Sequence, residues 1–342
     1  MLANIIVKPG NIELQEINTP KPSDGEILVK IKVALTCGTD LKAFLRGHPL
    51  IPMPGVCGHE FSGIVAEVGK GVRGFKKGDP IIAVHTAPSL KCMFCKKGLY
   101  NLCEKIMHTK VLGAFAEYIL LPSHVVRQNV FHKPKNLSFE EAAFLEPLSC
   151  VVHSIEPLDI KKGDSALIMG AGPIGLLHLI LLKSKKAKVA VSDIKRERLR
   201  IAKELGADLV IPSDPTTSFL KIPPFPKGGM EGFDYVFECT GKPEIWETSV
   251  NYLRRGGTLI LFGGCEKGTK VTYDTYRLHY DEITLKGAFH YTPDDVKKAY
   301  KLLCKGKLGL SRLISGSYPL RKTQEAFVKL SKGVGLKYAI IP

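Results

Sequence analysis

The stretch that decides the fold reads Ser165-Ala-Leu-Ile-Met-Gly170-Ala-Gly-Pro-Ile-Gly175. A short apolar strand runs directly into the pattern G-x-G-x-x-G, and an apolar, helix-like segment follows to Leu182. Gly170, Gly172 and Gly175 allow a tight turn and let the backbone approach a pyrophosphate that rests on the helix N-terminus. Because a strand precedes the glycines and a helix follows them, the stretch predicts a dinucleotide-binding βαβ unit.

The residues after this unit bear on which dinucleotide is bound. A second strand is expected at 188–192 and ends at Asp193, about twenty residues after the glycines, where a carboxylate takes the ribose hydroxyls. A carboxylate there repels a 2′-phosphate, so NAD is favoured over NADP. Lys195, Arg196 and Arg198 lie close by and weaken that preference.

The alternation of strands and helices continues to about residue 289. Six strands with intervening helices are typical of a doubly wound parallel sheet. The expected strands are 165–169, 188–192, 208–211, 233–238, 258–262 and 283–288, and the expected helices are 174–182, 195–205 and 243–254. The segment 212–232 holds Pro215, Pro223, Pro224 and Pro226, which exclude a regular helix throughout it and favour a surface excursion.

The first half is rich in strand patterns. In 26–37 the residues Ile27, Val29, Ile31 and Val33 alternate onto one face, and further strands are expected at 61–68, 79–84 and 113–121, between Gly and Pro punctuation. Many short strands of this kind predict a distorted barrel. A helix at 293–304 and a strand at 336–341 are expected to return the chain to this domain, giving domains of 1–148 with 290–342 and of 149–289.

Three separated segments carry candidate metal ligands. Cys37 follows the first strand, His59 and Glu60 come about twenty residues later, and Glu146 lies far down the chain. Thiolate, imidazole and carboxylate groups are ligands of zinc, and a catalytic zinc keeps one position open for water or substrate. The alternative is that Cys37 is a buried apolar thiol and His59 a core histidine; the glycines around them and the second half of the chain disfavour it.

A second cysteine group has the spacing of a structural metal site. Cys92 and Cys95 are three residues apart, and Cys103 follows eight residues later. A closed tetrahedral site needs a fourth ligand, and Ser89 stands where it would be expected, with His108 as a distant alternative. Since a hydroxyl is a poor zinc ligand, this lobe either holds zinc or keeps its thiols as apolar filler.

Composition excludes several other classes. The formal net charge is +16, but the basic residues are spread along all 342 positions without a basic arm, so nucleic acid is not the expected partner. An acidic or phosphorylated small substrate accounts for the charge equally well. The nine cysteines are an odd number and no secretory signal precedes them, and no apolar run is long enough for a bilayer. We therefore expect a cytoplasmic protein away from membranes.

Together these motifs resemble the zinc-dependent medium-chain alcohol and polyol dehydrogenases over essentially the whole chain. The matching pieces are Cys37-Gly-Thr-Asp40, Gly58-His-Glu-Phe-Ser-Gly63, the cysteine lobe, Gly113-Ala-Phe-Ala-Glu-Tyr118, Glu146-Pro-Leu148 and 170–175. The resemblance implies an α/β protein with a GroES-like β-barrel catalytic domain and a Rossmann domain. The pair Glu146-Pro147 is similar to the sorbitol, threonine and sugar-alcohol branch.

The resemblance also implies roles for individual residues. One catalytic zinc per chain would be held by Cys37, His59 and Glu60, with Glu146 binding it or its water, and Thr39 would relay the alcohol proton. The cofactor contacts would be Gly170, Gly172, Pro173, Ile174, Gly175, Asp193, Arg198, Thr240, Phe262 and Gly263. The family assembles as dimers or tetramers, and we expect a tetramer.

Three positions depart from the sorbitol dehydrogenases. The relay histidine is replaced by Lys42, which either passes the proton or binds an anionic group, or is simply a solvated charge. The next position, a tyrosine in those enzymes, is Ala43, and their Arg-Tyr pair is His290-Tyr291 here. The substrate side therefore reproduces only half of the polyol pocket, and sorbitol itself does not follow from the resemblance.

The function expected from the sequence is NAD-dependent interconversion of a secondary alcohol, such as a polyol or sugar derivative, and its ketone. L-threonine 3-dehydrogenase is the alternative within enzymes. A non-catalytic nucleotide-binding or structural protein is the alternative of another class. That alternative predicts lost zinc ligands, whereas Cys37, His59, Glu60 and Glu146 are all present.

Overall fold

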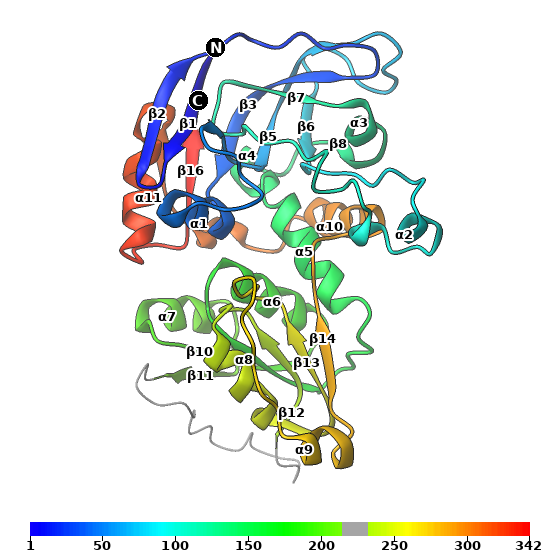
Figure 1. The fold of residues 1–342 in the computed structure, drawn as a ribbon, viewed down its shortest axis with the longest axis vertical. Coiled ribbons are helices and arrows are strands. Elements are labelled where there is room, and N and C mark those ends of the chain that lie inside the picture. Colours follow the sequence, from blue (N-terminus) through cyan, green and yellow to red (C-terminus); the bar gives the residue numbers. More distant parts are fainter. Residues whose placement is uncertain (214–231) are drawn as a thin grey trace. The chain divides into compact units, whose positions relative to one another are not determined.

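The structure, a computed structural model, describes residues 1–213 and 232–342. The chain forms two units (Figure 1): unit 1 comprises Met1–Cys150 and His290–Pro342, and unit 2 comprises Val151–Phe289. Helix α5 (Leu145–Ile155) carries the chain from the first unit into the second. Most of the predicted surface excursion at 212–232 lies outside the described residues.

Unit 1 is organised by a mostly antiparallel sheet in the order β15-β16-β3-β5-β6-β8, with β7 also pairing with β3. Its strands are β3 (Ile27–Leu35), β5 (Glu60–Val68), β6 (Pro80–Ala83), β7 (Tyr118–Leu121), β8 (Val130–His132), β15 (Ile314–Pro319) and β16 (Lys337–Ile341). Alternation of apolar residues places Ile27, Val29, Ile31 and Val33 in the core, as predicted. The predicted strand at 113–121 is wrong over its first half, because only Tyr118–Leu121 pairs with β3.

The last fifty residues complete unit 1. Strand β16 pairs antiparallel with β3, with Ala339 opposite Leu35, so the chain's C-terminal strand lies beside the strand that ends just before Cys37. A second sheet, β2-β1-β4, comprises β1 (Leu2–Lys8), β2 (Asn11–Glu16) and β4 (Gly55–Val56). The helices of this unit are α1 (Gly38–Arg46), α2 (Met93–Lys96), α3 (Ser123–Asn129), α4 (Phe139–Ala142), α10 (Pro293–Cys304) and α11 (Thr323–Ser331).

Unit 2 is a six-stranded parallel sheet in the order β11-β10-β9-β12-β13-β14, as the sequence predicted for a doubly wound fold. Its strands are β9 (Ser165–Met169), β10 (Lys188–Asp193), β11 (Leu209–Pro212), β12 (Phe233–Glu238), β13 (Leu253–Leu261) and β14 (Thr284–Gly287). Its helices are α6 (Pro173–Ser184), α7 (Arg196–Glu204), α8 (Pro243–Ser249) and α9 (Thr275–Tyr280). The central strand β9 is fully buried after its first residue, which explains its unbroken apolar sequence.

One predicted boundary in unit 2 is wrong. The helix expected at 243–254 ends at Ser249, a short 3₁₀ turn covers Val250–Tyr252, and β13 begins at Leu253. The apolar spacing suited a longer helix, but Leu253 is buried opposite Phe233 of β12, so strand pairing outweighs helical periodicity there.

Candidate active site and metal centre

The ends of two neighbouring strands bring the first ligand group together. Leu35 of β3 lies opposite Glu60 of β5, so Cys37, two residues beyond Leu35, lies close to His59 and Glu60. Their ligand atoms all lie within 4.8 Å of one another. His59 and Glu60 are buried and Cys37 is half-buried, which suits a site approached from one side only.

A buried carboxylate, Asp40, orients the His59 ring. Asp40 lies in the first turn of α1, and its Oδ1 is 3.4 Å from Nδ1 of His59 and accepts the Gly58 N–H at 3.2 Å. Burial alone would lower the pKa of His59, but the negative charges of Asp40 and Cys37 raise that pKa well above its usual value. Holding Nδ1 in this way leaves Nε2 for a metal, the usual arrangement of a ligating histidine.

Glu60 is held by a lysine from the far end of the sequence. Nζ of Lys337, the first residue of β16, lies 2.7 Å and 2.5 Å from the two Glu60 carboxylate oxygens and donates to the Thr36 carbonyl at 2.8 Å. Both side chains are almost completely buried. Burial raises the pKa of Glu60, and the Lys337 ammonium opposes that rise. The carboxylate next to Cys37 and His59 is therefore charge-compensated from within the protein.

Glu146 belongs to a second group in unit 1. It lies in the first turn of α5, and its ligand atom is within 4.8 Å of those of Cys150 and His290. Burial, the largest cause, raises the pKa of Glu146 to about 7. The four predicted ligands thus fall into two neighbouring triads, because Glu146 groups with Cys150 and His290 rather than directly with Cys37.

His85 links the two triads. Its Nδ1 lies 3.6 Å from Oε1 of Glu146, and its ring centroid lies 4.8 Å from that of His59. Burial and the nearby positive charge of His59 lower the pKa of His85 well below its usual value, so its ring is neutral. The sequence reasoning missed His85, although it follows directly after a buried apolar strand.

The two predicted substrate residues lie beside this link. Tyr291 is fully buried, and its hydroxyl is 3.3 Å from Nδ1 of His85 and accepts from Oγ1 of Thr86 at 2.9 Å. Oγ1 of Thr86 is also 2.6 Å from Nε2 of His290. A connected set of proton-carrying groups therefore runs from His290 to Glu146. Thr39 and Lys42 are half-buried on α1.

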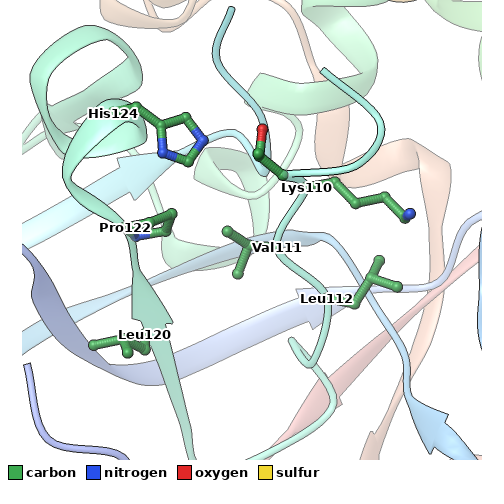
Figure 2. Close-up of a pocket in the computed structure, with 7 residues that line it drawn as sticks. Lys110, Val111, Leu112, Leu120, Pro122 and His124 are labelled. Carbon is green, nitrogen blue, oxygen red and sulfur yellow. The ribbon is translucent and has the colours of Figure 1, made fainter. Parts of the chain in front are cut away.

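A separate pocket of about 460 Å³ opens in unit 1 (Figure 2). It is lined mostly by apolar side chains, and none of its residues is a predicted site residue; the lining is Thr109, Lys110, Val111, Leu112, Leu120, Pro122 and His124. The Lys110 side chain extends away from His124 in Figure 2. Lys110 is the residue of this pocket that carries a positive charge.

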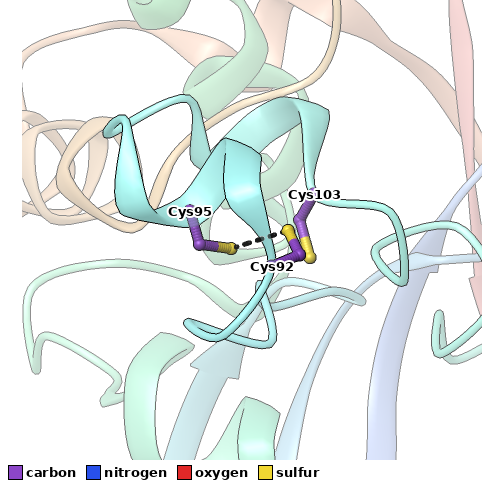
Figure 3. A group of neighbouring side chains, drawn as sticks. All are labelled: Cys92, Cys95 and Cys103. Atoms are coloured by element: carbon purple, nitrogen blue, oxygen red, sulfur yellow. Dashed lines mark hydrogen bonds between the residues drawn. The ribbon is translucent and has the colours of Figure 1, made fainter.

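The cysteine lobe brings its three thiols together (Figure 3). Cys92, Cys95 and Cys103 lie within 4.8 Å of one another, with the Cys92 and Cys95 sulfurs 3.5 Å apart. Ser89 faces them, its Oγ lying 3.3 Å from Cys103 Sγ and 3.9 Å from Cys95 Sγ. Backbone N–H groups of Cys95 and Glu104 lower the pKa of Cys92 to about 6, so this thiol is readily ionised.

The alternative fourth ligand His108 is exposed, and the metal-binding group that the described residues form in this lobe contains the three cysteines without it. The structure therefore does not bring His108, the distant alternative, into the group of three thiols. Ser89 lies beside the thiols and offers an oxygen in place of a sulfur.

In unit 2 the glycine loop has the shape of a phosphate cradle. Gly170 has φ of +103°, and a Cβ on Gly175 would stand 1.8 Å from the Gly170 carbonyl oxygen, so both positions require glycine. A Cβ on Gly172 would meet nothing within 4 Å, which leaves open space above the loop. Gly172 caps α6 without a side-chain hydrogen bond, and Pro173 is the first residue of the helix. The orphan N–H groups there suit an anion.

Asp193 ends β10 beside this loop. Its two carboxylate oxygens accept hydrogen bonds of 2.8 Å from the N–H groups of Ala171 and Lys195, and Arg198 lies 3.8 Å away. The carboxylate therefore ties the glycine loop to the next strand. Nε of Arg198 is buried without a hydrogen-bond partner among the described residues.

The remaining predicted cofactor residues follow the ends of β12, which lies beside β9, and of β13, the next strand of the sheet. Thr240 follows β12, and its N–H donates to Glu238 at 2.7 Å. Phe262 and Gly263 follow β13, and a Cβ on Gly263 would stand 2.2 Å from the Gly241 nitrogen. Carboxyl ends of central parallel strands are where such sheets bind ligands.

Comparison with known proteins agrees with this geometry. The sequence model for the alcohol dehydrogenase GroES-like domain matches residues 23–133, and that for the zinc-binding dehydrogenase domain matches residues 173–305. A D-arabinitol dehydrogenase of Uromyces fabae is 32% identical, with 100% of this chain and 97% of the relative covered. The chain belongs to the zinc-dependent medium-chain dehydrogenases. A Macaca fascicularis sorbitol dehydrogenase is 31% identical, with 98% and 94% covered.

Solved structures of this family match along the whole chain. The 2R,3R-butanediol dehydrogenase of Bacillus subtilis has a TM-score of 0.85 at 27% identity, covering 100% of this chain and 99% of its own. A Sinorhizobium meliloti protein bound to NADP has a TM-score of 0.87 at 30% identity, with the same coverage. This medium-chain dehydrogenase is an α/β protein with a GroES-like domain and a Rossmann domain, and it takes zinc and a nicotinamide cofactor.

Proposed function

We propose that this dehydrogenase oxidises a secondary hydroxyl of a polyol or sugar derivative to the ketone, and catalyses the reverse reduction. The observation that carries the proposal is the buried meeting of Cys37, His59 and Glu60 within 4.8 Å, supported by Asp40 and Lys337. The relatives named as arabinitol and sorbitol dehydrogenases support the polyol class.

The donor set fits a catalytic zinc. A thiolate and an imidazole held by a buried carboxylate are typical zinc ligands, and Glu60 and Glu146 are the candidates for the third. When bound, zinc supplies a Lewis acid that polarises the oxygen of the alcohol or ketone. Because Lys337 already engages both Glu60 oxygens, Glu146 is the freer of the two carboxylates, and it would bind the zinc directly or hold its water.

Residues of unit 1 handle the proton that leaves the alcohol. Thr39 lies on α1 two residues after Cys37 and would take it, and Lys42, one turn further on, would pass it to water. His85, Tyr291, Thr86 and His290 offer a second connected set beside Glu146. Thr39→Val, with its hydroxyl replaced by a methyl, separates these routes, since only the first contains Thr39.

For the cofactor we propose NAD. Gly170, Gly172, Pro173, Ile174 and Gly175 would hold the pyrophosphate and the nicotinamide side, with Thr240, Phe262 and Gly263 at the neighbouring strand ends. Asp193 is 7% exposed and carries its negative charge where a 2′-phosphate would lie. Arg198 beside it is the residue that would favour NADP. A higher kcat/KM with NADP than with NAD would overturn this choice.

We also propose a zinc in the cysteine lobe, held by Cys92, Cys95 and Cys103 with the Ser89 oxygen or water as fourth ligand. The close approach of three thiols supports it, while the hydroxyl predicts weaker binding than four thiolates give. Metal analysis of the purified protein distinguishes one zinc from two per chain.

A cytoplasmic homotetramer remains the proposed setting, tested by sedimentation and by fractionation of cells. No helix among the described residues is long and apolar enough to cross a membrane.

The deciding experiment measures NAD and NADP reduction across pentitols, hexitols, butanediol and L-threonine, with zinc content determined on the same sample. Turnover of a polyol by zinc-loaded protein, lost after chelation and restored by zinc, supports the proposal. Turnover of L-threonine alone would replace it with the threonine alternative. Absence of both turnover and zinc binding in folded protein would support the non-catalytic alternative.

A further inference from the structure

Basic side chains gather beside the metal ligands of unit 1. Helix α1 begins directly after Cys37 and carries Lys42 and Arg46, and His48 follows its end. Lys110 comes from a distant segment, which is anchored to the site because the Val111 N–H donates to the His85 carbonyl at 2.8 Å. Two separate pieces of chain therefore bring cations to the same region.

Two histidines carry the electrostatic effect of these cations. Burial is the main reason that the pKa of His48 is lowered, and the positive charges of Lys42, Arg46 and Lys110 lower it further, against Asp40. Lys110 also contributes to the low pKa of His85, which is 3.6 Å from Glu146. The Val111–His85 hydrogen bond places the segment that carries Lys110 directly against His85, which lies beside both Glu146 and His59.

Lys110 is poorly compensated compared with Lys337. Its half-buried ammonium donates to the Met107 carbonyl at 2.8 Å, and no carboxylate among the described residues lies within ion-pair distance of it. Burial lowers its pKa. Lys337, in contrast, faces Glu60. A partly desolvated cation with one neutral partner gains from an anionic ligand.

We propose that the substrate of this enzyme carries an anionic group, a phosphate monoester or a carboxylate, which Lys110 binds together with Arg46 and Lys42. The inference rests on the proposed function and names its substrate class. The secondary hydroxyl would lie at Cys37 and His59. The carbon that bears this hydroxyl gives a hydride to NAD⁺, and the hydroxyl oxygen loses a proton. The anionic group stays on the substrate and is not altered by the reaction.

The test compares matched substrates. Steady-state kcat/KM is measured for pentitols and hexitols, their terminal phosphates and the corresponding aldonates, so that the phosphate and carboxylate arms are separated. We expect at least a roughly tenfold higher kcat/KM for one anionic arm than for the neutral polyol, carried mainly by KM and reduced by added salt.

Matched variants locate the effect. Lys110→Gln and, separately, Arg46→Gln should lower kcat/KM for the anionic substrate about tenfold or more and leave the neutral polyol within about twofold. Lys77→Gln removes an equal charge from an exposed position of unit 1 and should change neither. Thermal unfolding checks that each variant is folded. If Lys110→Gln does not fold, Arg46→Gln provides the test in its place.

The outcomes separate this inference from the proposed function. Oxidation of neutral polyols with no preference for either anionic arm overturns the anion site and leaves the proposed function standing. If no polyol is oxidised, the proposed function fails, and calorimetric titration of the zinc-loaded protein with pentitol and pentitol phosphate decides the anion site. Tighter binding of the phosphate, lost in Lys110→Gln, supports it; equal binding overturns it.

Discussion

Two of the thiol-containing groups of unit 1 each bring three ligand atoms within 4.8 Å of one another but differ in their surroundings. Around Cys37, His59 and Glu60, buried charged residues hold the ligands: Asp40 holds His59, and Lys337 holds Glu60. Around Cys92, Cys95 and Cys103 the close neighbours are Ser89 and the apolar Ile106. A metal site that keeps an open position needs outer groups to fix its few ligands, whereas a closed site can rely on ligand number alone.

The largest difference between the two groups should be seen when one thiol is removed from each and kcat is compared. We expect Cys37→Ser to lose the catalytic zinc and to lower kcat at least about a thousandfold, roughly 4 kcal/mol, because the polarising cation is lost. Cys92→Ser should keep kcat within about tenfold. Metal content and kcat are measured on the same samples. A folded Cys92→Ser protein without turnover would contradict the division of roles.

Breaking the buried ion pair should have the next largest effect. Lys337→Met leaves Glu60 as an uncompensated buried carboxylate, and we expect it to destabilise unit 1 by about 3–5 kcal/mol. Denaturant unfolding of metal-free protein measures this, with Lys337→Arg as the variant that keeps the charge. Adding Glu60→Gln to Lys337→Met should recover part of the loss. Wild-type stability of Lys337→Met would show that the pair is not needed.

The orientation of His59 can be tested more gently. Asp40→Asn removes the charge beside Nδ1 while keeping the side chain's size, and outer-shell changes of this kind typically lower metal affinity about 10- to 100-fold. Competition with a chelator measures the affinity. Asp24→Asn, at an exposed position of the same unit, is the matched control. Equal zinc affinity in the wild-type, Asp40→Asn and Asp24→Asn proteins would refute an orienting role for Asp40.

The smallest effect on turnover is expected in the lobe. Ser89→Cys supplies a fourth thiolate next to Cys103 and should slow zinc loss from the lobe more than tenfold during dialysis against a chelator, while kcat changes less than about twofold. Ser89→Ala is the comparison that removes the oxygen. If Ser89→Cys retains no more zinc than Ser89→Ala, the lobe is not a metal site.

Much of the fold could be read from the sequence because its signals are local. The glycine loop, the run of buried strands and the six-strand count all depend on neighbours a few residues away. The misplaced end of the helix at 243–254 and the overlong strand at 113–121 show the limit, since pairing partners such as Phe233 and Lys30 decide those boundaries. The clustering of Cys92, Cys95 and Cys103 was also readable, because their spacing lies within one loop.

What the sequence by itself determined is the family's chemistry: which ligand types are present, the phosphate cradle, and the serine in the lobe. Only the tertiary structure decided how those groups are held. Lys337 reaches Glu60 across 277 positions because β16 returns to β3, and Asp40 and His85 acquire roles only when the strands meet. A buried charge must find its partner wherever the fold places one, and no local pattern records that distance.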